Sequence, residues 1–320
     1  MKTNKPFLIG VCGNSGSGKS GFVQLLVDLL GEKNVLVIHG DDYHKWQRGD
    51  EEWTRYTHLN PAANNLLLAK EHLSDLKNGN AVYKVEYGHD TGKFIGPYKV
   101  QARKYIIFEG LHVFIPKGLR DKFDFKIFID VDKKLNAHFK IHRDIAERGY
   151  TREKIVKAIN SREKDAEKYI YPQKQFADLI IKKTPLHDLD ESKREVAVDY
   201  TFIHRKTINA NPLARIFKKL FKDKVTCEYN KNNYTVRTAS VLKEDELKSL
   251  KKTAKKEFGI NLTDNVFSLV QLIAAYNICA YGSKVGKLKY PHRGKIGKST
   301  TVPKCKKVNG VLKCSLKPRG

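Results

Sequence analysis

Eight residues near the amino terminus have the types and spacing of a phosphate-binding loop. They read GNSGSGKS and match the pattern G-x-x-x-x-G-K-[ST] at every defined position. Glycines let successive backbone N–H groups turn toward phosphate oxygens, and a helix that follows points its positive end at them. We expect Lys19 to reach the β- and γ-phosphates of a nucleotide and Ser20 to hold Mg²⁺ through its hydroxyl. The predicted nucleotide-binding residues are Gly13, Asn14, Ser15, Gly16, Ser17, Gly18, Lys19 and Ser20.

Acidic residues stand directly after two other apolar runs. VLVIHGDDYH places Asp41 and Asp42 just beyond one predicted strand, and YIIFEGLH places Glu109 at the end of another. Phosphoryl transfer to a hydroxyl needs a carboxylate that orients the acceptor oxygen and takes its proton. Either aspartate can do this while the other binds metal or caps the next segment. Glu109 has the position of an acid that assists Mg²⁺, or it is a solvated strand-end residue.

A basic segment with helical spacing follows the fourth apolar run. In KIHRDIAERG, Lys140, Asp144 and Arg148 share one helical face, and Arg143 lies beside them. One interpretation is an exposed helix laced with ion pairs. The other is a lid whose cations close on the transferred phosphoryl group and stabilise its developing charge. Arg162, on the next predicted helix, is a further candidate for this cationic set.

The elements that must position these residues alternate along the first half of the chain. Apolar runs at 7–12, 35–38, 105–110, 125–132 and 177–183 are predicted strands; helices are expected at 18–30, from Asn60-Pro61 to Asn78-Gly79, at 133–148 and at 151–168. Alternation of this kind predicts an α/β fold with a mostly parallel sheet flanked by helices. Ligands of such sheets bind at the carboxyl ends of the strands, where the acidic residues fall.

The rest of the chain has a different pattern, which divides it into three predicted parts. Residues 1–185 form the α/β core, 186–281 a C-terminal α+β extension packed on the core, and 282–320 a basic tail. The apolar stretch 266–281 is interrupted by Gln271 and Asn277, so it predicts a buried helix rather than a membrane span. No signal peptide is expected either, and we therefore predict a cytoplasmic protein.

Net charge and cysteines leave two alternatives open. The formal net charge is +26, and no acidic residue follows Asp264. This excess favours attraction to anionic metabolites, although nucleic-acid binding through the basic tail is the other interpretation. Cys305 and Cys314 are equidistant from Asn309-Gly310, which predicts a hairpin that places them opposite each other. In a reducing compartment both are expected to be free thiols.

Taken together, the motifs resemble those of the phosphoribulokinase/uridine kinase family. GNSGSGKS, DDYH, EGLH and HRDIAERG occur in the family's order, and DDYHKWQR, THLNPAANN, VEYGHDTG and YIYPQKQFADLII lean toward the phosphoribulokinase branch. The resemblance covers about residues 5–185 and implies a P-loop kinase fold. It also implies Asp41 as the base, Glu109 as the metal-assisting acid, and Lys140, Arg143, Asp144 and Arg148 as the phosphate-serving lid. Sugar-phosphate contacts are implied for His44, Arg48, His89 and Arg162.

The activity that follows is transfer of the γ-phosphoryl group of ATP to a hydroxyl of ribulose 5-phosphate, with Mg²⁺. A surplus of cations suits an acceptor that already carries a phosphate, because a dianion is bound well by arginine. The alternatives are a uridine/cytidine kinase or another small-metabolite kinase, and a nucleotide-dependent nucleic-acid-binding protein. The predicted partners are ATP, a phosphopentose and a second copy of the chain as a homodimer. Ser17 occupies a position where plant-type members carry a regulatory cysteine.

Overall fold

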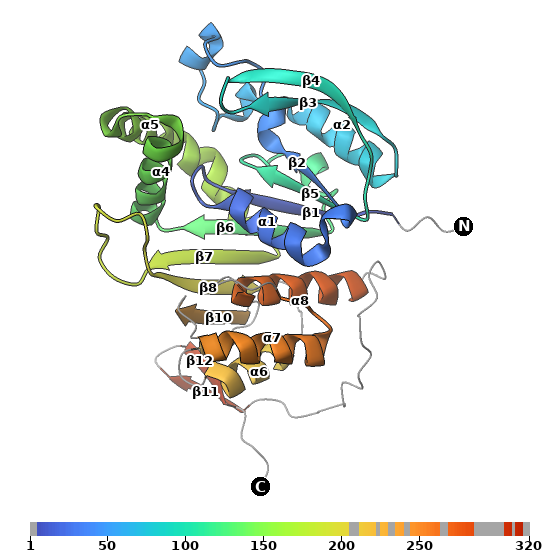
Figure 1. Ribbon diagram of the computed structural model, residues 1–320, viewed down its shortest axis with the longest axis vertical. Helices are drawn as coiled ribbons and strands as arrows, with labels where there is room; N and C mark the ends of the chain where they lie inside the picture. The colour runs from blue at the N-terminus through green and yellow to red at the C-terminus, as the bar shows by residue number, and fades with distance from the viewer. Residues whose placement is uncertain are drawn as a thin grey trace. The chain divides into compact units, whose positions relative to one another are not determined.

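The first strand, β1 (Phe7–Gly13), is buried at every position and lies inside a parallel sheet. It pairs with β5 (Tyr105–Gly110) on one side and β6 (Phe125–Val131) on the other, and β5 pairs in turn with β2 (Val35–His39) (Figure 1). A strand covered on both faces has a continuous apolar sequence rather than an alternating one. The apolar runs of the sequence therefore predict these four strands correctly.

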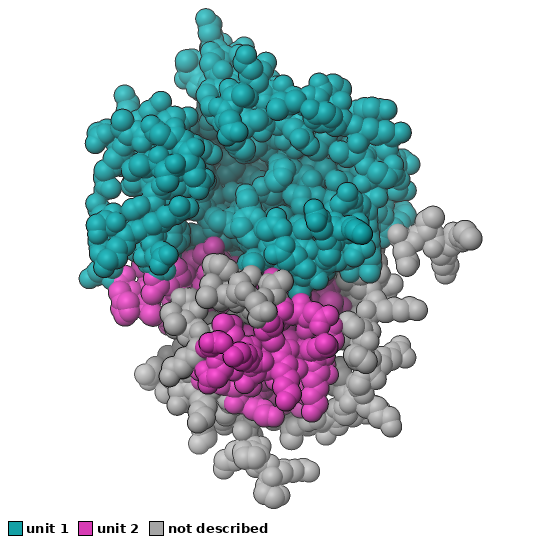
Figure 2. Space-filling model, viewed as in Figure 1, with its two compact units in different colours: residues 1–177, 188–196 teal, residues 178–187, 197–320 magenta. Residues whose placement is uncertain are grey.

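The structure is a computed structural model that describes residues 5–204, 211–221, 225–229, 234–239, 244–262, 268–284, 304–308 and 311–315. Its contacts divide the chain into two units, coloured separately in Figure 2. Unit 1 consists of residues 1–177 and 188–196, and unit 2 of residues 178–187 and 197–320. The last predicted core strand, near residue 180, is grouped with unit 2.

Helices connect the strands of unit 1. They are α1 (Lys19–Leu30), α2 (Leu66–Lys77), the short α3 (Lys117–Arg120), α4 (Lys133–Arg148) and α5 (Arg152–Asp165). A π-helical turn (Ala166–Ile170) and a 3₁₀ segment (Tyr171–Phe176) continue from α5. Asp132 caps α4 by accepting from the backbone N–H groups of Lys134 and Leu135, and Thr151 caps α5 in the same manner. These two caps set the start of each lid helix where the sequence predicts it.

The predicted start of α2 is wrong. Asn60 does cap a turn, but that turn is a 3₁₀ segment that ends at Ala63, and α2 begins only at Leu66 with Asn65 as its cap. The interruption is Asn64, whose amide donates to the backbone oxygens of His58 and Asn60. Because this amide holds the chain in an extended conformation, the helix starts one turn later than the cap-and-proline signal predicts.

An antiparallel hairpin that the sequence does not predict lies between α2 and β5. Its strands are β3 (Val82–Gly88) and β4 (Lys93–Val100), and they pair only with each other. Most of β4 is exposed on both faces, so the strand lacks the apolar run by which a buried strand is recognised. The turn at its end brings His89 toward β2, as described below.

Unit 2 contains an antiparallel sheet with the order β7-β8-β10-β9. The strands are β7 (Leu179–Pro185), β8 (Val198–His204), β9 (Val225–Tyr229) and β10 (Tyr234–Ala239), and the helices are α6 (Asn211–Phe221), α7 (Glu244–Phe258) and α8 (Ser268–Lys284). The buried-helix prediction is confirmed, since Gln271 and Asn277 are 0% exposed within α8. Asn277 Oδ1 lies 2.7 Å from His204 Nδ1, so this buried amide has a hydrogen-bond partner.

The end of the chain forms the predicted hairpin. Strands β11 (Lys304–Val308) and β12 (Val311–Ser315) pair so that Cys305 lies opposite Cys314. The predicted turn residues, and residues 285–303 and 316–320 of the predicted basic tail, lie outside the described residues.

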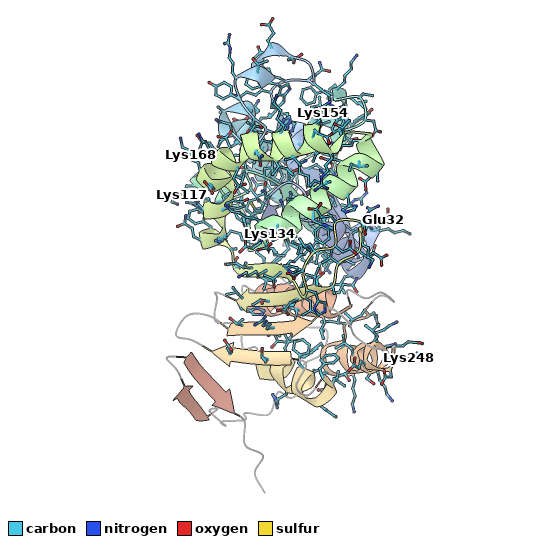
Figure 3. All side chains as sticks on the ribbon, turned by 90° about the vertical axis from the view of Figure 1, so that its left-hand side faces the viewer. Glu32, Lys117, Lys134, Lys154, Lys168 and Lys248 are labelled. Carbon is cyan, nitrogen blue, oxygen red and sulfur yellow. The ribbon has the colours of Figure 1, made fainter. Side chains whose placement is uncertain are left out.

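The positive charge of unit 1 is spread over several elements. Lys117, Lys134, Lys154 and Lys168 belong to α3, α4, α5 and the π-helical turn, and all are exposed (Figure 3). This distribution suits a solvated surface better than one nucleic-acid groove. Among the described helices, none is long and apolar enough to cross a membrane.

Gly10, in the middle of β1, lies where a side chain would have no room. A Cβ atom there would meet Phe114 at 2.7 Å, Val113 at 3.0 Å and Phe123 at 3.1 Å. We expect Gly10→Ala to lower the free energy of unfolding by about 1–3 kcal/mol through overpacking, measured by urea denaturation. Gly21→Ala is the matched control, because nothing lies within 4 Å of a Cβ at that helical position. A loss of stability in the control equal to that of Gly10→Ala would contradict this explanation.

Candidate active site

The glycine-rich loop has the backbone geometry of a phosphate cradle. Gly16 and Gly18 have φ angles of 81° and 82°, a conformation that favours glycine, and α1 starts directly after them at Lys19. No side chain caps α1 and no acidic residue lies in its first turn, so its N–H groups remain available to an anion. The Lys19 ammonium donates to the backbone oxygen of Asn14 at 3.0 Å, which keeps it over the loop.

Ser20, in the first turn of α1, lies next to Glu109, near the end of β5. The Ser20 hydroxyl is 3.4 Å from Glu109 Oε1, and that same oxygen lies 2.9 Å from His39 Nδ1. The hydrogen bond to Glu109 raises the pKa of His39. A hydroxyl and a carboxylate are oxygen ligands of the kind that Mg²⁺ prefers, with phosphate and water completing its shell. Within the described ranges, no three His, Cys, Asp or Glu side chains gather as an all-protein metal site.

The two adjacent aspartates have different environments. Asp42 is buried and accepts from Lys84 Nζ at 2.7 Å and from the backbone N–H of Tyr87 at 2.9 Å. Its carboxylate therefore binds β2's end to the β3–β4 hairpin. The Asp41 carboxylate, about one third exposed, instead lies 3.7 Å from His44 Nε2 and 3.4 Å from His89 Nε2. Of the two carboxylates, only that of Asp41 is placed to meet a ligand.

Arg48 and the hairpin turn position His89. The Arg48 guanidinium donates to the backbone oxygens of His89 at 2.6 Å and of Asp90 at 3.2 Å. Gly92 lies so close to the Arg48 side chain that a Cβ atom at position 92 would clash with Arg48 Cβ. Gly92 also has a φ of 72°, so glycine is required there on two grounds. The Arg48 fork thus supports the turn that carries His89.

A hydrogen-bond chain assigns the ring orientation of His44. Asn64 donates its amide N–H groups to two backbone oxygens, which identifies its remaining atom, Oδ1, as the acceptor that faces His44 Nδ1 at 2.8 Å. His44 Nδ1 must then carry a proton, and Nε2 faces Asp41. Burial opposes ionisation of Asp41, but attraction to His44, His89 and Lys19 outweighs it and lowers the pKa of this carboxyl.

Four predicted lid residues form one ionic cluster on α4. Asp144 is 2% exposed and accepts from Lys140 at 2.6 Å, from Arg143 at 2.7 and 2.9 Å, and lies 3.4 Å from Arg148. Burial raises the pKa of Asp144, yet Lys140 and Arg143 reverse the shift and lower it. The residues are ion-paired as the first interpretation predicts, but Lys140 and Asp144 are buried rather than exposed, and three cations surround a single acid.

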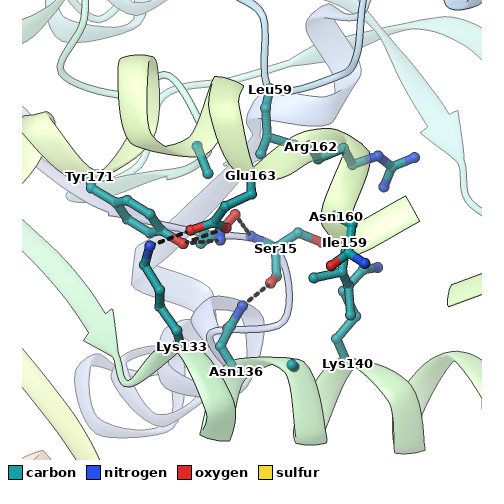
Figure 4. Close-up of a pocket in the computed structure, with 13 residues that line it drawn as sticks. Ser15, Leu59, Lys133, Asn136, Lys140, Ile159, Asn160, Arg162, Glu163 and Tyr171 are labelled. Carbon is teal, nitrogen blue, oxygen red and sulfur yellow. Dashed lines mark hydrogen bonds and ion pairs between the residues drawn. The ribbon is translucent and has the colours of Figure 1, made fainter. Parts of the chain in front are cut away.

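A cavity of about 290 Å³ lies between the glycine-rich loop and helices α4 and α5 (Figure 4). In the space-filling view, the surface of unit 1 is hollowed (Figure 2). Asn136 of α4 donates to the Ser15 backbone oxygen at 3.1 Å, so α4 contacts the loop directly. Asn14 donates at 3.1 Å to the hydroxyl of Tyr171, in the 3₁₀ segment after α5, and that hydroxyl donates to Glu163 of α5 at 3.4 Å. The lining residues are Asn14, Ser15, Leu59, Lys133, Asn136, Ala137, Lys140, Ile159, Asn160, Arg162, Glu163, Ala166 and Tyr171.

The thiol nearest the loop is chemically protected. Cys12 is buried in β1 beside Gln173, and burial raises its pKa to about 12. Because thiolate formation at Cys12 is suppressed and the loop itself contains no cysteine, the described part of the loop region offers no reactive thiol.

Apart from the glycine-rich loop and Glu109 beside it, the predicted site residues form two groups in unit 1. Asp41, His44, Arg48 and His89 gather around the end of β2, and the lid residues gather around Asp144, with Arg162 lining the cavity beside Lys140. Sequence patterns missed several residues that complete these groups: His39, Trp53, His58, Lys84, His112, Asn136 and Tyr171. They have no spacing signal of their own, because each reaches the site through a contact with a distant segment.

Two buried histidines predict how stability depends on pH. Burial lowers the pKa of His58 to about 3 and that of His112 to about 4, whereas 6.5 is the ordinary value. In this range the unfolded chain binds protons at these histidines and the folded chain does not. The free energy of unfolding should therefore fall as pH decreases from about 6.5 to 4.5. We expect His112→Gln to make this dependence shallower by up to about 1.4 kcal/mol per pH unit, measured by urea unfolding across that range. Equal slopes for both proteins would contradict the assignment.

Comparisons with known proteins agree with this geometry. The Phosphoribulokinase / Uridine kinase family matches residues 8–190. A phosphoribulokinase from Synechocystis is 36% identical over 236 residues, which are 69% of this chain and 69% of that protein. A chloroplast phosphoribulokinase from Arabidopsis thaliana is 37% identical over 56% of this chain, but only 49% of that protein is covered.

Two further matches bear on the fold and on the other branch of the family. A uridine kinase from Clostridium perfringens is 33% identical over 55% of this chain and 87% of that protein. The solved structure of phosphoribulokinase from Rhodobacter spheroides superposes with a TM-score of 0.59 at 20% identity, over 88% of this chain and all of that one. The chain therefore belongs to the phosphoribulokinase/uridine kinase family, whose members are kinases that transfer a phosphoryl group to a hydroxyl.

Proposed function

We propose that this kinase transfers the γ-phosphoryl group of ATP to a hydroxyl of ribulose 5-phosphate, giving ribulose 1,5-bisphosphate. The observation that carries the proposal is the Asp41 carboxylate, which lies between His44 and His89 just beyond the end of β2. The carboxylate suits the reactive hydroxyl of an acceptor. The cations near it, Arg48 at the hairpin turn and Arg162 beside Lys140, suit a phosphate on the same acceptor.

Each group of side chains has a separate part in the transfer. Asp41 orients the acceptor hydroxyl and takes its proton as the new O–P bond forms and the bond to the β-phosphate oxygen of ATP breaks. Although burial opposes ionisation, attraction to His44, His89 and Lys19 lowers the pKa of Asp41, which favours the ionised carboxylate that can accept a proton. Lys19 and the α1 N–H groups bind the phosphates that remain on ADP, and Lys140, Arg143 and Arg148 stabilise charge on the transferred group.

Ser20 and Glu109 would hold Mg²⁺, which supplies neutralisation of phosphate charge when bound. Their 3.4 Å separation is compatible with a shared shell that includes phosphate and water oxygens. Arg48, His89 and Arg162 are the proposed contacts of the acceptor phosphate. The homodimer and the cytoplasmic location remain predictions from the sequence.

A uridine or cytidine kinase is the second candidate, favoured by the 33% identity to the clostridial uridine kinase. An ADP-release assay with ribulose 5-phosphate, ribose 5-phosphate, uridine and cytidine separates the two. We expect turnover with ribulose 5-phosphate and little with either nucleoside. Turnover with uridine and none with ribulose 5-phosphate would reject the proposal.

The adjacent aspartates supply a matched pair of variants. Asp41→Asn should lower kcat by about 10³-fold, because the proton acceptor is lost, while ATP binding and unfolding free energy stay nearly unchanged. Asp42→Asn should instead cost about 3 kcal/mol of stability, since it leaves the buried Lys84 ammonium without its main partner. Steady-state kinetics, ATP titration and urea unfolding of both variants check this. Full turnover in Asp41→Asn would show that the base is elsewhere.

A further inference from the structure

The segment around His58 lies between the two halves of the site. On one side, the His58 ring stacks on His44 with 5.3 Å between centroids and an angle of 29° between planes. On the other, the neighbouring Leu59 lines the cavity that Lys140 and Arg162 also line (Figure 4). Thr57 fixes the segment to the end of α5 by donating to Asp165 Oδ2 at 2.7 Å. His58 is therefore next to His44, the neighbour of Asp41, and close to the cations Lys140 and Arg162.

The position of the His58 ring is fixed without use of its nitrogens. Its backbone oxygen accepts from His112 Nε2 at 3.0 Å and from the Asn64 amide at 3.2 Å. The ring also packs against Trp53, with 4.2 Å between the centroids. Among the described residues no side chain or backbone group bonds either ring nitrogen, and Nδ1 is buried without a partner. Nε2 has no partner among the described residues either and is not sealed in this way, so it is the ring nitrogen that a ligand can reach.

The charge of His58 decides which part of a ligand it suits. Burial, and then repulsion by Arg162 and His44, lower its pKa to about 3, so the imidazole is neutral at physiological pH. A neutral imidazole has one donor and one acceptor nitrogen and adds no charge for binding a phosphate. The surrounding arginines and lysine already supply that charge. A hydroxyl or carbonyl oxygen is the complementary partner.

We propose that His58 is a substrate-positioning residue that hydrogen-bonds a neutral oxygen of the acceptor's carbon chain, while the cations hold the acceptor's phosphate. This inference rests on the proposed function in that the acceptor is a phosphorylated polyhydroxy compound. It adds a residue that distinguishes acceptors by the position of their hydroxyl and carbonyl groups. A buried, unpaired imidazole rejects an acceptor without the matching oxygen more strongly than an exposed residue does.

The test compares His58→Phe, His58→Asn and the exposed control His187→Asn in the full-length chain. The wild-type protein is first assayed with ribulose 5-phosphate and with the nucleosides, and the variants are then assayed with the acceptor that it phosphorylates best. If the wild-type protein does not phosphorylate ribulose 5-phosphate, the proposed function is rejected, and the role of His58 is still tested with the acceptor that the protein does phosphorylate. We expect His58→Phe to raise the acceptor KM about tenfold with the KM of ATP unchanged, His58→Asn to recover part of this loss, and His187→Asn to have no effect.

Acceptor analogues that each lack one chain oxygen separate positioning from a structural role. For the analogue that lacks the oxygen bound by His58, wild type and His58→Phe should have the same KM, because the contact is absent from both. A tenfold gap that persists with every analogue, an unchanged acceptor KM in His58→Phe, or an equal rise in the KM of ATP would overturn the proposal. Thermal unfolding of each variant verifies that the comparison is made between folded proteins.

Discussion

The register of four parallel strands is the constraint on which the rest of unit 1 depends. Cys12 lies opposite Gly110, and His39 lies opposite Glu109, so the carboxyl ends of β1, β2 and β5 come to the same edge. A Cβ on Gly40 would approach the Glu109 backbone oxygen and Gly110 Cα to 3.1 Å, which explains a glycine just before the paired aspartates. Because the strand ends are this close, the sheet itself brings together Lys19, Glu109 and Asp41, the proposed phosphate-binding, metal-assisting and acceptor-side residues.

A buried ion pair gives the neighbouring residues Asp41 and Asp42 different environments. Asp42 and Lys84 are 5% and 4% exposed at the side chain, so their pairing ties the β3–β4 hairpin to the end of β2. With that carboxylate occupied, Asp41 is the member of the pair that faces the histidines. The hairpin returns His89 to Asp41, and Arg48 holds the turn that carries it. One acid is thus occupied in assembly, and its neighbour is the one that we propose for the chemistry.

The sequence predicts those features that local pattern determines. Apolar runs identify the buried strands, and the cap residues Asp132 and Thr151 mark the lid helices correctly. The hairpin at 82–100 was not predictable in this manner, because its exposed strands lack a buried face. The cap-and-proline signal misplaces the start of α2, since Asn64 interrupts the helix by bonding the backbone oxygens of His58 and Asn60 and the ring of His44. The same holds for His58 itself, whose role depends on contacts with Trp53, His112 and Asn64 rather than on spacing.

The lid shows why its cations can be assembled before any phosphate arrives. Three like charges packed on one helix would repel one another, and burial alone lowers the pKa of Lys140. Asp144, almost fully buried among them, offsets part of this repulsion through short, charge-assisted hydrogen bonds. One carboxylate cannot neutralise three cations, so the cluster keeps a net positive charge. That residual charge, held on a helix beside the glycine-rich loop, supports the proposed role of these cations toward the transferred phosphoryl group, which an exposed row of ion pairs would not serve.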